Sequence, residues 1–257
     1  MPSTIGGVGV AFTDRHGGVS TGERASLNLG QTDRDDVGSL RANMASVCSA
    51  LDVERVVVTA QVHGADVLTV DEALLATWGP DAWLGTAVPG QAGLPVADAL
   101  VTSLPGIALA VRVADCVPVV FADADAGAIG VAHAGRVGLL AGVVPAALAA
   151  LVRLGADPER MSAWIGPHIC GSCYEVPPEM ARAAEAALPG TACRTRWGTP
   201  ALDLGAGVVA QLGGLGVRDI TRVDPCTMES PDLFSHRRDG AGTGRQAGLV
   251  WRGAPMG

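Results

Sequence analysis

The residues of this chain best suited to chemistry are two histidines and a cysteine, each beside an apolar run. His63 and His133 come shortly before turn-forming glycines, and Cys116 interrupts two apolar runs between them. Imidazole nitrogen and thiolate sulfur are the preferred zinc donors, and three protein ligands leave a fourth position for water or substrate. Their separation is too long for a zinc finger, so from the pattern alone the alternative stays open that all three are ordinary core residues.

One acid and one cysteine pair accompany this trio. Asp115 stands beside Cys116 in an apolar setting, where a carboxylate needs a partner. It is a candidate for orienting a ligand or transferring a proton, and a structural partner of the site is the equal alternative. Cys170 and Cys173 form a Cys-x-x-Cys pair, but no second pair or histidine follows at finger spacing, so we predict neither a metal nor a redox site there.

Two polar loops are candidates for binding an anion. The loop that begins at Arg15 is rich in glycine, and its backbone amides suit a negative group, although it lacks the fixed spacing of a phosphate loop. Arg237 and Arg238 lie in a turn-rich segment near the C-terminus, and arginine forks suit phosphate or carboxylate. A plain turn and a solvated surface loop are the respective alternatives.

Helical and strand-like patterns must position these residues. We expect helices at residues 33–51, 140–154, 179–188 and 204–212, where apolar residues recur at helical spacing. Short β-branched runs bounded by Gly, Pro or Asp predict strands at residues 56–59, 67–70, 99–102, 107–113, 117–122, 128–133 and 161–165, with one more near 220. This order predicts a mixed α/β fold. No linker or repeat divides the chain, so we expect one domain over residues 1–257.

Composition and charge narrow the classes of function. Apolar residues make up 48% of the chain and charged residues 17%, which excludes disorder and predicts a large core. The formal net charge of -8 argues against nucleic acid as a partner. The apolar stretch 137–152 is shorter than the ~20 residues of a membrane span and contains Pro145, so we expect a buried helix and no membrane partner. Few cysteines and no visible secretory signal predict a cytoplasmic protein.

Motifs along nearly the whole chain carry a family resemblance. They are residues 15, 17–20, 27–30, 43, 61–64, 97–102, 114–119, 133–135, 165–167, 174–176, 234–240 and 244–246. In this order they resemble the YfiH-like bacterial family once called multicopper polyphenol oxidases, laccase-domain proteins or peptidoglycan editing factors. That family is now regarded as zinc purine nucleoside phosphorylases with adenosine deaminase activity.

The resemblance implies a fold, a metal and an activity. The fold is two β-sheets packed as a sandwich and covered by helices, and the metal is Zn2+ bound by His63, Cys116 and His133. The activity is that of a purine nucleoside phosphorylase, whose small-molecule substrates are a purine nucleoside and phosphate, with adenosine deaminase and methylthioadenosine phosphorylase side activities. Asn43 and Gln61 then become candidates for amide hydrogen bonds to the substrate, and the arginines above for phosphate. The sequence carries no signal for the oligomeric state.

Two positions depart from the family pattern. The family's usual His-Ala-Gly-Trp-Arg-Gly reads here with Arg136 and Val137 in place of Trp and Arg. Arg136 is displaced by one residue from the family arginine, and neighbouring residues of a strand point to opposite faces, so we do not expect it to replace that charge. Met44 stands where an arginine commonly follows Asn43. Both changes bear on substrate preference rather than on the metal.

Two other functions remain as alternatives, and a third is not expected. A cell-wall precursor editing hydrolase, acting on a nucleotide-linked muramyl amino acid, would use Cys116 as a nucleophile paired with His133 and need no metal. A non-catalytic division or wall partner would hold zinc as a structural clip, which requires a fourth protein ligand. Copper oxidation is not expected, because five histidines without a Met-bearing ligand cluster are too few for several copper ions.

Overall fold

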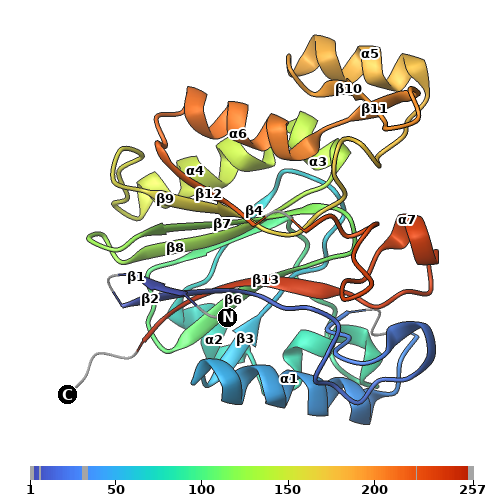
Figure 1. The fold of residues 1–257 in the computed structure, drawn as a ribbon. Coiled ribbons are helices and arrows are strands. Elements are labelled where there is room, and N and C mark those ends of the chain that lie inside the picture. Colours follow the sequence, from blue (N-terminus) through green and yellow to red (C-terminus); the bar gives the residue numbers. More distant parts are fainter. Residues whose placement is uncertain (1–2, 6, 31–33, 224, 254–257) are drawn as a thin grey trace.

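Two β-sheets lie face to face in the computed structural model, which describes residues 3–5, 7–30, 34–223 and 225–253 (Figure 1). The first sheet has the order β1 (Ser3–Ile5), β2 (Val8–Phe12), β13 (Gln246–Arg252), β6 (Ile107–Val113) and β3 (Arg55–Val57). The second has the order β12 (Asp219–Arg222), β9 (Ser162–Ile165), β7 (Val117–Asp123), β8 (Ala128–Ala134), β5 (Ala99–Thr102) and β4 (Val67–Thr69). Both sheets mix parallel and antiparallel pairs, so the expected mixed α/β sandwich is confirmed.

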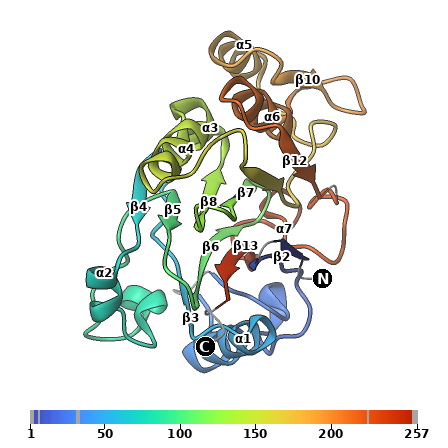
Figure 2. The same cartoon turned by 90° about the vertical axis from the view of Figure 1, so that its left-hand side faces the viewer.

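Helices cover the outer faces of the sandwich (Figures 1 and 2). The helix α1 (Val37–Leu51) packs on the first sheet, and α3 (Arg136–Ala141), α4 (Val143–Arg153) and α6 (Leu204–Gly214) lie over the second. Beyond α6, α5 (Pro178–Ala187) packs on a two-stranded hairpin, β10 (Ala192–Arg194) and β11 (Pro200–Leu202). Short elements complete the chain: η1 (Gly22–Arg24), α2 (Glu72–Thr77), η2 (Ala82–Ala87) and α7 (His236–Asp239).

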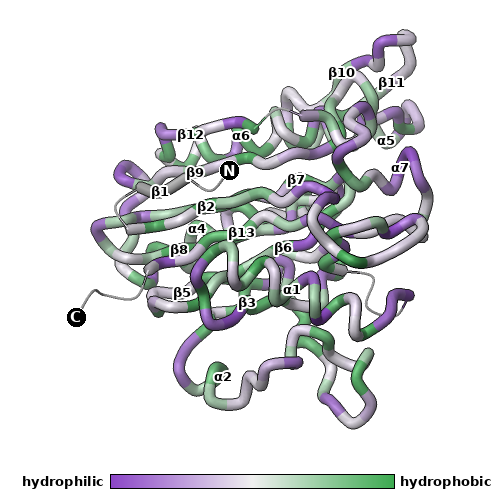
Figure 3. Tube along the Cα trace, turned by 60° about the horizontal axis from the view of Figure 1, so that its bottom comes forward, coloured by the Kyte–Doolittle hydropathy of each residue, from purple (hydrophilic) through white to green (hydrophobic). Residues whose placement is uncertain are grey.

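The two central strands of the second sheet, β7 and β8, are buried at every position. One face of these strands packs against the first sheet and the other face packs against α4. The side chains on both faces of the strands are therefore covered. Val131 lies in the core between the sheets, whereas its neighbour Ala132 lies in the core under the helices. Continuous apolar runs are typical of strands covered on both faces. Figure 3 shows this apolar band along the inner strands and polar residues at α7.

The helix expectations hold with shifted bounds. The helix α1 begins at Val37 because the carboxylate of Asp36 caps it, accepting a hydrogen bond from Ser39 N. The expected start at residue 33 lies outside the described residues. The expected helix 140–154 is two helices that meet at Gly142, whose φ of 91° ends the first. Within the part of the chain that is described, every helix is too short or too polar to cross a membrane.

The C-terminal strand β13 was not predicted; the sequence indicated only a turn-rich segment that leads up to it. It pairs with β2 on one side and β6 on the other, at the centre of the first sheet. Gly248 allows this position, because a Cβ there would lie 2.9 Å from Pro118 Cβ in the opposite sheet. The close approach of the two sheets therefore requires glycine at position 248. Glycine is uncommon in strands, so it weakens the local sequence signal for β13.

Candidate active site

Three separate strand ends bring His63, Cys116 and His133 together. His63 follows β3 in a loop, Cys116 immediately precedes β7, and His133 lies near the end of β8. Their ligand atoms all lie within 4.8 Å of one another, and Cys116 Sγ is 3.7 Å from His63 Nε2. The two imidazole rings meet edge to face at 4.8 Å between centroids. The grouping proposed from residue type is thus present in space.

The backbone around the cluster is specialised for close approach. His63 has a φ of 60°, in the left-handed region that non-glycine residues seldom adopt. Gly135 lies directly against the cluster, where a Cβ would be 2.6 Å from His63 Cδ2 and 3.0 Å from Cys116 Sγ. A Cβ added at Gly138 would likewise lie only 2.7 Å from Gly64 O. The glycines of this segment are therefore needed to seat α3 on the His63 loop.

The carboxylate of Asp98 positions two of the three donors. It is fully buried at the start of β5, and its Oδ1 accepts hydrogen bonds from His63 N at 2.9 Å and His133 Nδ1 at 2.8 Å. Its Oδ2 accepts from Val62 N at 3.1 Å and Gly64 N at 2.7 Å. A carboxylate on Nδ1 fixes the tautomer and leaves Nε2 for a metal. Sequence reasoning did not assign Asp98 a role, although an acid directly before a buried strand was the available signal.

Charges within the cluster shift the pKa values of its members. Burial raises the pKa of the Cys116 thiol, but hydrogen bonds and positive charge from His133 and His63 outweigh this effect and bring it to about 6. Burial lowers the pKa of His133, but Asp98 and Cys116 stabilise the imidazolium and raise it to about 9. The metal-free cluster is therefore a thiolate beside an imidazolium at neutral pH.

The donor set fits a zinc-type ion. Two imidazole nitrogens and one thiolate sulfur are the ligands that zinc prefers, and three of them leave one coordination position free. Tetrahedral zinc with a Zn–S distance of about 2.3 Å and Zn–N of about 2.0 Å needs S···N separations of about 3.5 Å. The observed 3.7 Å between Cys116 Sγ and His63 Nε2 meets this requirement with little movement.

A cavity of about 500 Å³ opens above the cluster. Its lining residues are Gly30, Gln61, His63, Arg112, Val113, Ala114, Asp115, Cys116, His133, Arg136, Ile169, Tyr174, Leu204, His236, Arg237 and Arg245. This volume suits a small-molecule ligand the size of a nucleoside. Four of the lining residues are arginines, and Asp115 is the only acid among the described lining residues. The cavity is therefore cationic in a chain whose formal net charge is -8.

Two of these arginines come from neighbouring parts of the first sheet: Arg112 lies in β6, and Arg245 directly precedes β13. Burial and the positive charge of Arg245 lower the pKa of Arg112 to about 10. Arg112 donates to Thr59 O at 2.8 Å, and Arg245 donates to Thr243 O and Gly244 O. Like charges held side by side favour binding of an anion between them. The sequence placed Arg245 in the C-terminal segment whose arginines suit an anion, but Arg112 was not identified, because no local pattern joins the two.

Arg136 corrects a premise of the sequence analysis. The strand β8 ends at Ala134, and Arg136 is the first residue of α3, so the alternation of a strand does not apply. The side chain lines the cavity near Tyr174. Burial and the Cys116 charge raise the pKa of the Tyr174 hydroxyl, while Arg136 and Arg237 oppose that shift. The departure from the family pattern therefore keeps a positive charge beside the cluster.

The two amide candidates, Asn43 and Gln61, use their hydrogen bonds within the protein. Asn43 is fully buried, accepts from Val19 N, and donates to Ser20 Oγ and Asn28 O. It does not line the cavity. Gln61 does line it, but its amide pairs with both backbone groups of Arg112 at 2.8 and 2.9 Å. Both side chains hold loops that shape the cavity.

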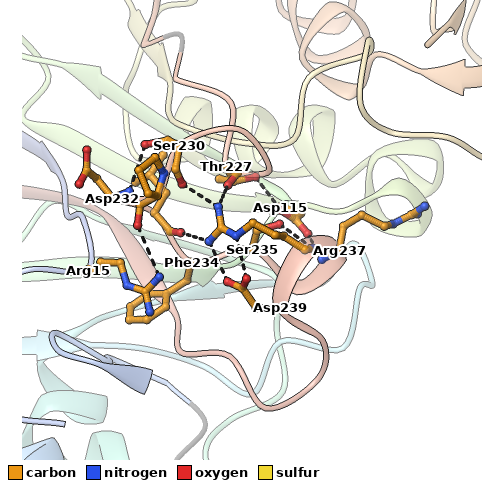
Figure 4. A network of polar contacts seen from close by, with 12 residues as sticks. Arg15, Asp115, Thr227, Ser230, Asp232, Phe234, Ser235, Arg237 and Asp239 are labelled. Atoms are coloured by element: carbon orange, nitrogen blue, oxygen red, sulfur yellow. Dashed lines mark hydrogen bonds and ion pairs between the residues drawn. The ribbon is translucent and has the colours of Figure 1, made fainter. Parts of the chain in front are cut away.

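The carboxylate of Asp115 ties the C-terminal loop to the site, as Figure 4 shows. It accepts from Thr227 Oγ1 at 2.6 Å and from Arg237 N at 2.6 Å. The side chain of Arg237 reaches the cavity wall, where it donates to Glu175 O and lies 5.1 Å from the centroid of the Tyr174 ring. Asp115 therefore positions a cationic loop beside the cluster.

The remaining two arginines named from the sequence, Arg15 and Arg238, are not among the residues that line the cavity. Arg238 donates to Thr227 O, Ser230 O and Leu233 O, and so closes the loop on itself. Arg15 donates to Ala25 O and stacks on Phe234 at 4.7 Å. Both guanidinium groups are engaged with the protein around the site.

The chain is similar to known proteins over most of its length. A family model described as multi-copper polyphenol oxidoreductase laccase matches residues 9–253. A protein of Streptomyces coelicolor named purine nucleoside phosphorylase is 50% identical over 250 residues, covering 96% of this chain and 97% of its own. One of Corynebacterium glutamicum with the same name is 46% identical over 243 residues, covering 93% of this chain and 92% of its own.

A solved structure shares the fold. The crystal structure of YlmD from Geobacillus stearothermophilus superimposes with a TM-score of 0.85 at 32% identity, covering 96% of this chain and 93% of its own. A Geobacillus stearothermophilus protein of that name is called a purine nucleoside phosphorylase. The chain belongs to the multi-copper polyphenol oxidoreductase laccase family, as its matched residues and its relatives show.

Proposed function

We propose that this protein is a zinc-dependent purine nucleoside phosphorylase, with residues 1–257 acting as one catalytic domain. The observation that carries the proposal is a cationic cavity of nucleoside size that opens directly onto a cluster of three metal donors. The names of relatives at 46–50% identity support the same activity. A multicopper oxidase is disfavoured, because the three donors of this cluster are too few to bind several copper ions.

Phosphorolysis needs an anion held against a sugar. A phosphate oxygen forms a bond to the anomeric carbon of ribose as the bond from that carbon to the purine nitrogen breaks, and the purine leaves with a proton. Arg136, at the start of α3, and Arg237, in α7, both line the cavity and would bind the phosphate through charge-assisted hydrogen bonds. Zinc, when bound by His63, Cys116 and His133, would polarise a phosphate oxygen or a water.

The same site supports the side activities that we propose. Deamination of adenosine replaces the purine amino group by the oxygen of water, and so requires the base rather than the ribose near the cluster. Methylthioadenosine phosphorolysis uses the first pose with an apolar group on the sugar, for which Ile169 and Leu204 offer apolar lining. We place the protein in the cytoplasm, where thiol ligands stay reduced.

Metal analysis combined with product chromatography tests this proposal. The purified protein is incubated with adenosine, with and without phosphate, and inosine, hypoxanthine and adenine are separated. We expect release of free base only with phosphate and formation of inosine in both conditions. Cys116→Ala is expected to abolish both, whereas Cys48→Ser, in α1, keeps both. Base release that persists without phosphate, or an active Cys116→Ala variant, contradicts the mechanism.

One observation favours a second function, hydrolysis by a cysteine nucleophile. Cys116, His133 and Asp98 form a thiolate, imidazolium and carboxylate series, which is the arrangement of a cysteine hydrolase. A metal-free enzyme of that kind would be inactivated by alkylation of Cys116, and no bound metal would protect the thiolate from the reagent. Full activity on a nucleotide-linked muramyl amino acid after removal of zinc would support this reading instead.

A further inference from the structure

A second group of metal donors lies outside the cavity lining. Cys170, Cys173, Cys226 and Glu229 each offer one ligand atom, and the four atoms all lie within 4.8 Å of one another. From the sequence, no metal site was predicted at Cys170 and Cys173, because no second pair of donors follows at the spacing of a zinc finger. The second pair is Cys226-x-x-Glu229, more than fifty residues further along the chain.

Both pairs sit on turns of the same construction. In the first turn Cys173 N donates to Cys170 O at 3.0 Å, and in the second Glu229 N donates to Cys226 O at 3.1 Å. Each turn therefore directs its first and fourth side chains to one side. Two such turns facing each other are typical of structural zinc sites, where each supplies two ligands.

The protein holds the two turns together without a disulfide. The backbone N–H of Cys170 donates to Cys226 Sγ at 3.3 Å, and Thr227 N donates to His168 O at 3.1 Å. All three cysteines are free. In tetrahedral zinc, sulfurs about 2.3 Å from the metal lie about 3.8 Å apart, so the 4.8 Å limit leaves about 1 Å for contraction.

The surroundings compensate the charge that a metal site would carry. Cys173 and Cys226 are buried beside Ile169, so their thiolates need a cation. Three thiolates and one carboxylate around a divalent ion leave a net negative charge. Arg196 offsets this negative charge, because its Nη2 is 2.5 Å from Cys173 Sγ and 2.6 Å from Glu229 Oε1.

We propose that Cys170, Cys173, Cys226 and Glu229 bind a second zinc ion, with a structural role. Four protein ligands close the coordination sphere, in contrast to the three donors of the candidate active site. The two turns lead directly into the cavity wall: Tyr174 follows the first, and Thr227 of the second donates to Asp115. The ion therefore fixes the wall of the cavity.

The stoichiometry of zinc in the full chain tests this proposal without any assay of activity. By mass spectrometry of the metal we expect about two zinc ions per chain in the wild type and about one in Cys226→Ser, as the closed site is lost. Cys116→Ala is also expected to retain about one, and the double variant none. Cys48→Ser, a cysteine in α1 away from both clusters, is the matched control and should keep both.

A second variant and a spectroscopic probe show whether zinc is lost because a ligand is missing or because the protein is misfolded. Glu229→Gln changes an exposed ligand and should weaken zinc at this site at least tenfold while the fold persists. In the Cys116→Ala background, added Co2+ should give a tetrahedral spectrum with thiolate charge-transfer absorption, which Cys226→Ser removes. Loss of all zinc in Cys116→Ala, or a Cys170–Cys173 disulfide in non-reduced peptides, overturns the proposal. Undiminished zinc in Cys226→Ser overturns it equally.

Discussion

Replacing Asp98 by Asn is expected to lower both the stability of the fold and the affinity for zinc. A control variant that lowers the stability alone then distinguishes the two effects. The carboxylate accepts four hydrogen bonds, two on each oxygen. An amide retains one oxygen, so two of the four donors lose their acceptor and face an NH2 group. Hydrogen bonds to a charged group contribute about 1.5–3 kcal/mol each, which predicts a loss of about 3–6 kcal/mol in the free energy of unfolding.

The effect on the metal follows from the same geometry. If the amide nitrogen faces His133, Nδ1 must accept a hydrogen bond and the proton moves to Nε2, which removes the lone pair that would bind zinc. Loss of such a partner typically weakens metal affinity about 10–100-fold. We expect Asp98→Asn to show this decrease in competition with a chromophoric chelator, and phosphorolysis to fall with zinc occupancy.

Asp123→Asn is the matched control. Asp123 is also buried and accepts four hydrogen bonds, from Asp125 N, Ala126 N, Asp157 N and Arg160 Nη2. It ends β7, whereas Cys116 precedes the start of that strand, so the two sites lie at opposite ends of β7. We expect a similar drop in melting temperature and unchanged zinc affinity. The reasoning is refuted if Asp98→Asn binds zinc as tightly as Asp123→Asn does.

Three further predictions concern the cluster and the cavity. Gly135→Ala places a Cβ against His63 and Cys116, and overpacking of about 1–3 kcal/mol should lower zinc affinity roughly tenfold, measured by chelator competition. Arg136→Gln removes a positive charge from the cavity and should raise KM for phosphate about tenfold or more, measured by steady-state kinetics. In zinc-free protein the lowered pKa of Cys116 keeps its thiolate at neutral pH, so alkylation followed by mass spectrometry should reach half its maximal rate near pH 6.

Control variants distinguish local from general effects. Gly213→Ala lies in α6 with no atom within 4 Å of the added Cβ, and it should leave zinc affinity unchanged. Arg153→Gln removes an exposed charge from α4, and an equal rise in KM there would mean that the overall charge, not the cavity, attracts phosphate. Burial raises the pKa of Cys48, so its alkylation should require higher pH than that of Cys116.

The strands that are buried on both faces were among those that the sequence predicted well. The strands β7 and β8 match their expected ranges to within one residue, because continuous apolar runs ended by Asp or Gly are a local signal. The strand β13 was missed, because its place in the sheet depends on pairing with β2 and β6 across most of the chain. Gly248 and the polar residues before β13 resemble a turn when read alone.

The candidate site divides in the same way. Residue type and strand-end position indicated His63, Cys116 and His133, since few groups of this kind occur in so apolar a chain. Arg112 carries no such signal, because it meets Arg245 only when β6 and β13 pair. Arg136 was misjudged because its orientation depends on where β8 ends and α3 begins.

The sequence by itself determined the apolar strands, the amphipathic helices and the set of soft donor residues, because these depend on side-chain chemistry and short-range periodicity. Only the tertiary structure decided which donors meet. The carboxylate of Asp98, the arginines of the cavity, and the pairing of Cys170 with Cys226 all join segments that lie far apart in the chain. Their proximity comes from the packing of the two sheets and the loops between them, which no local pattern encodes.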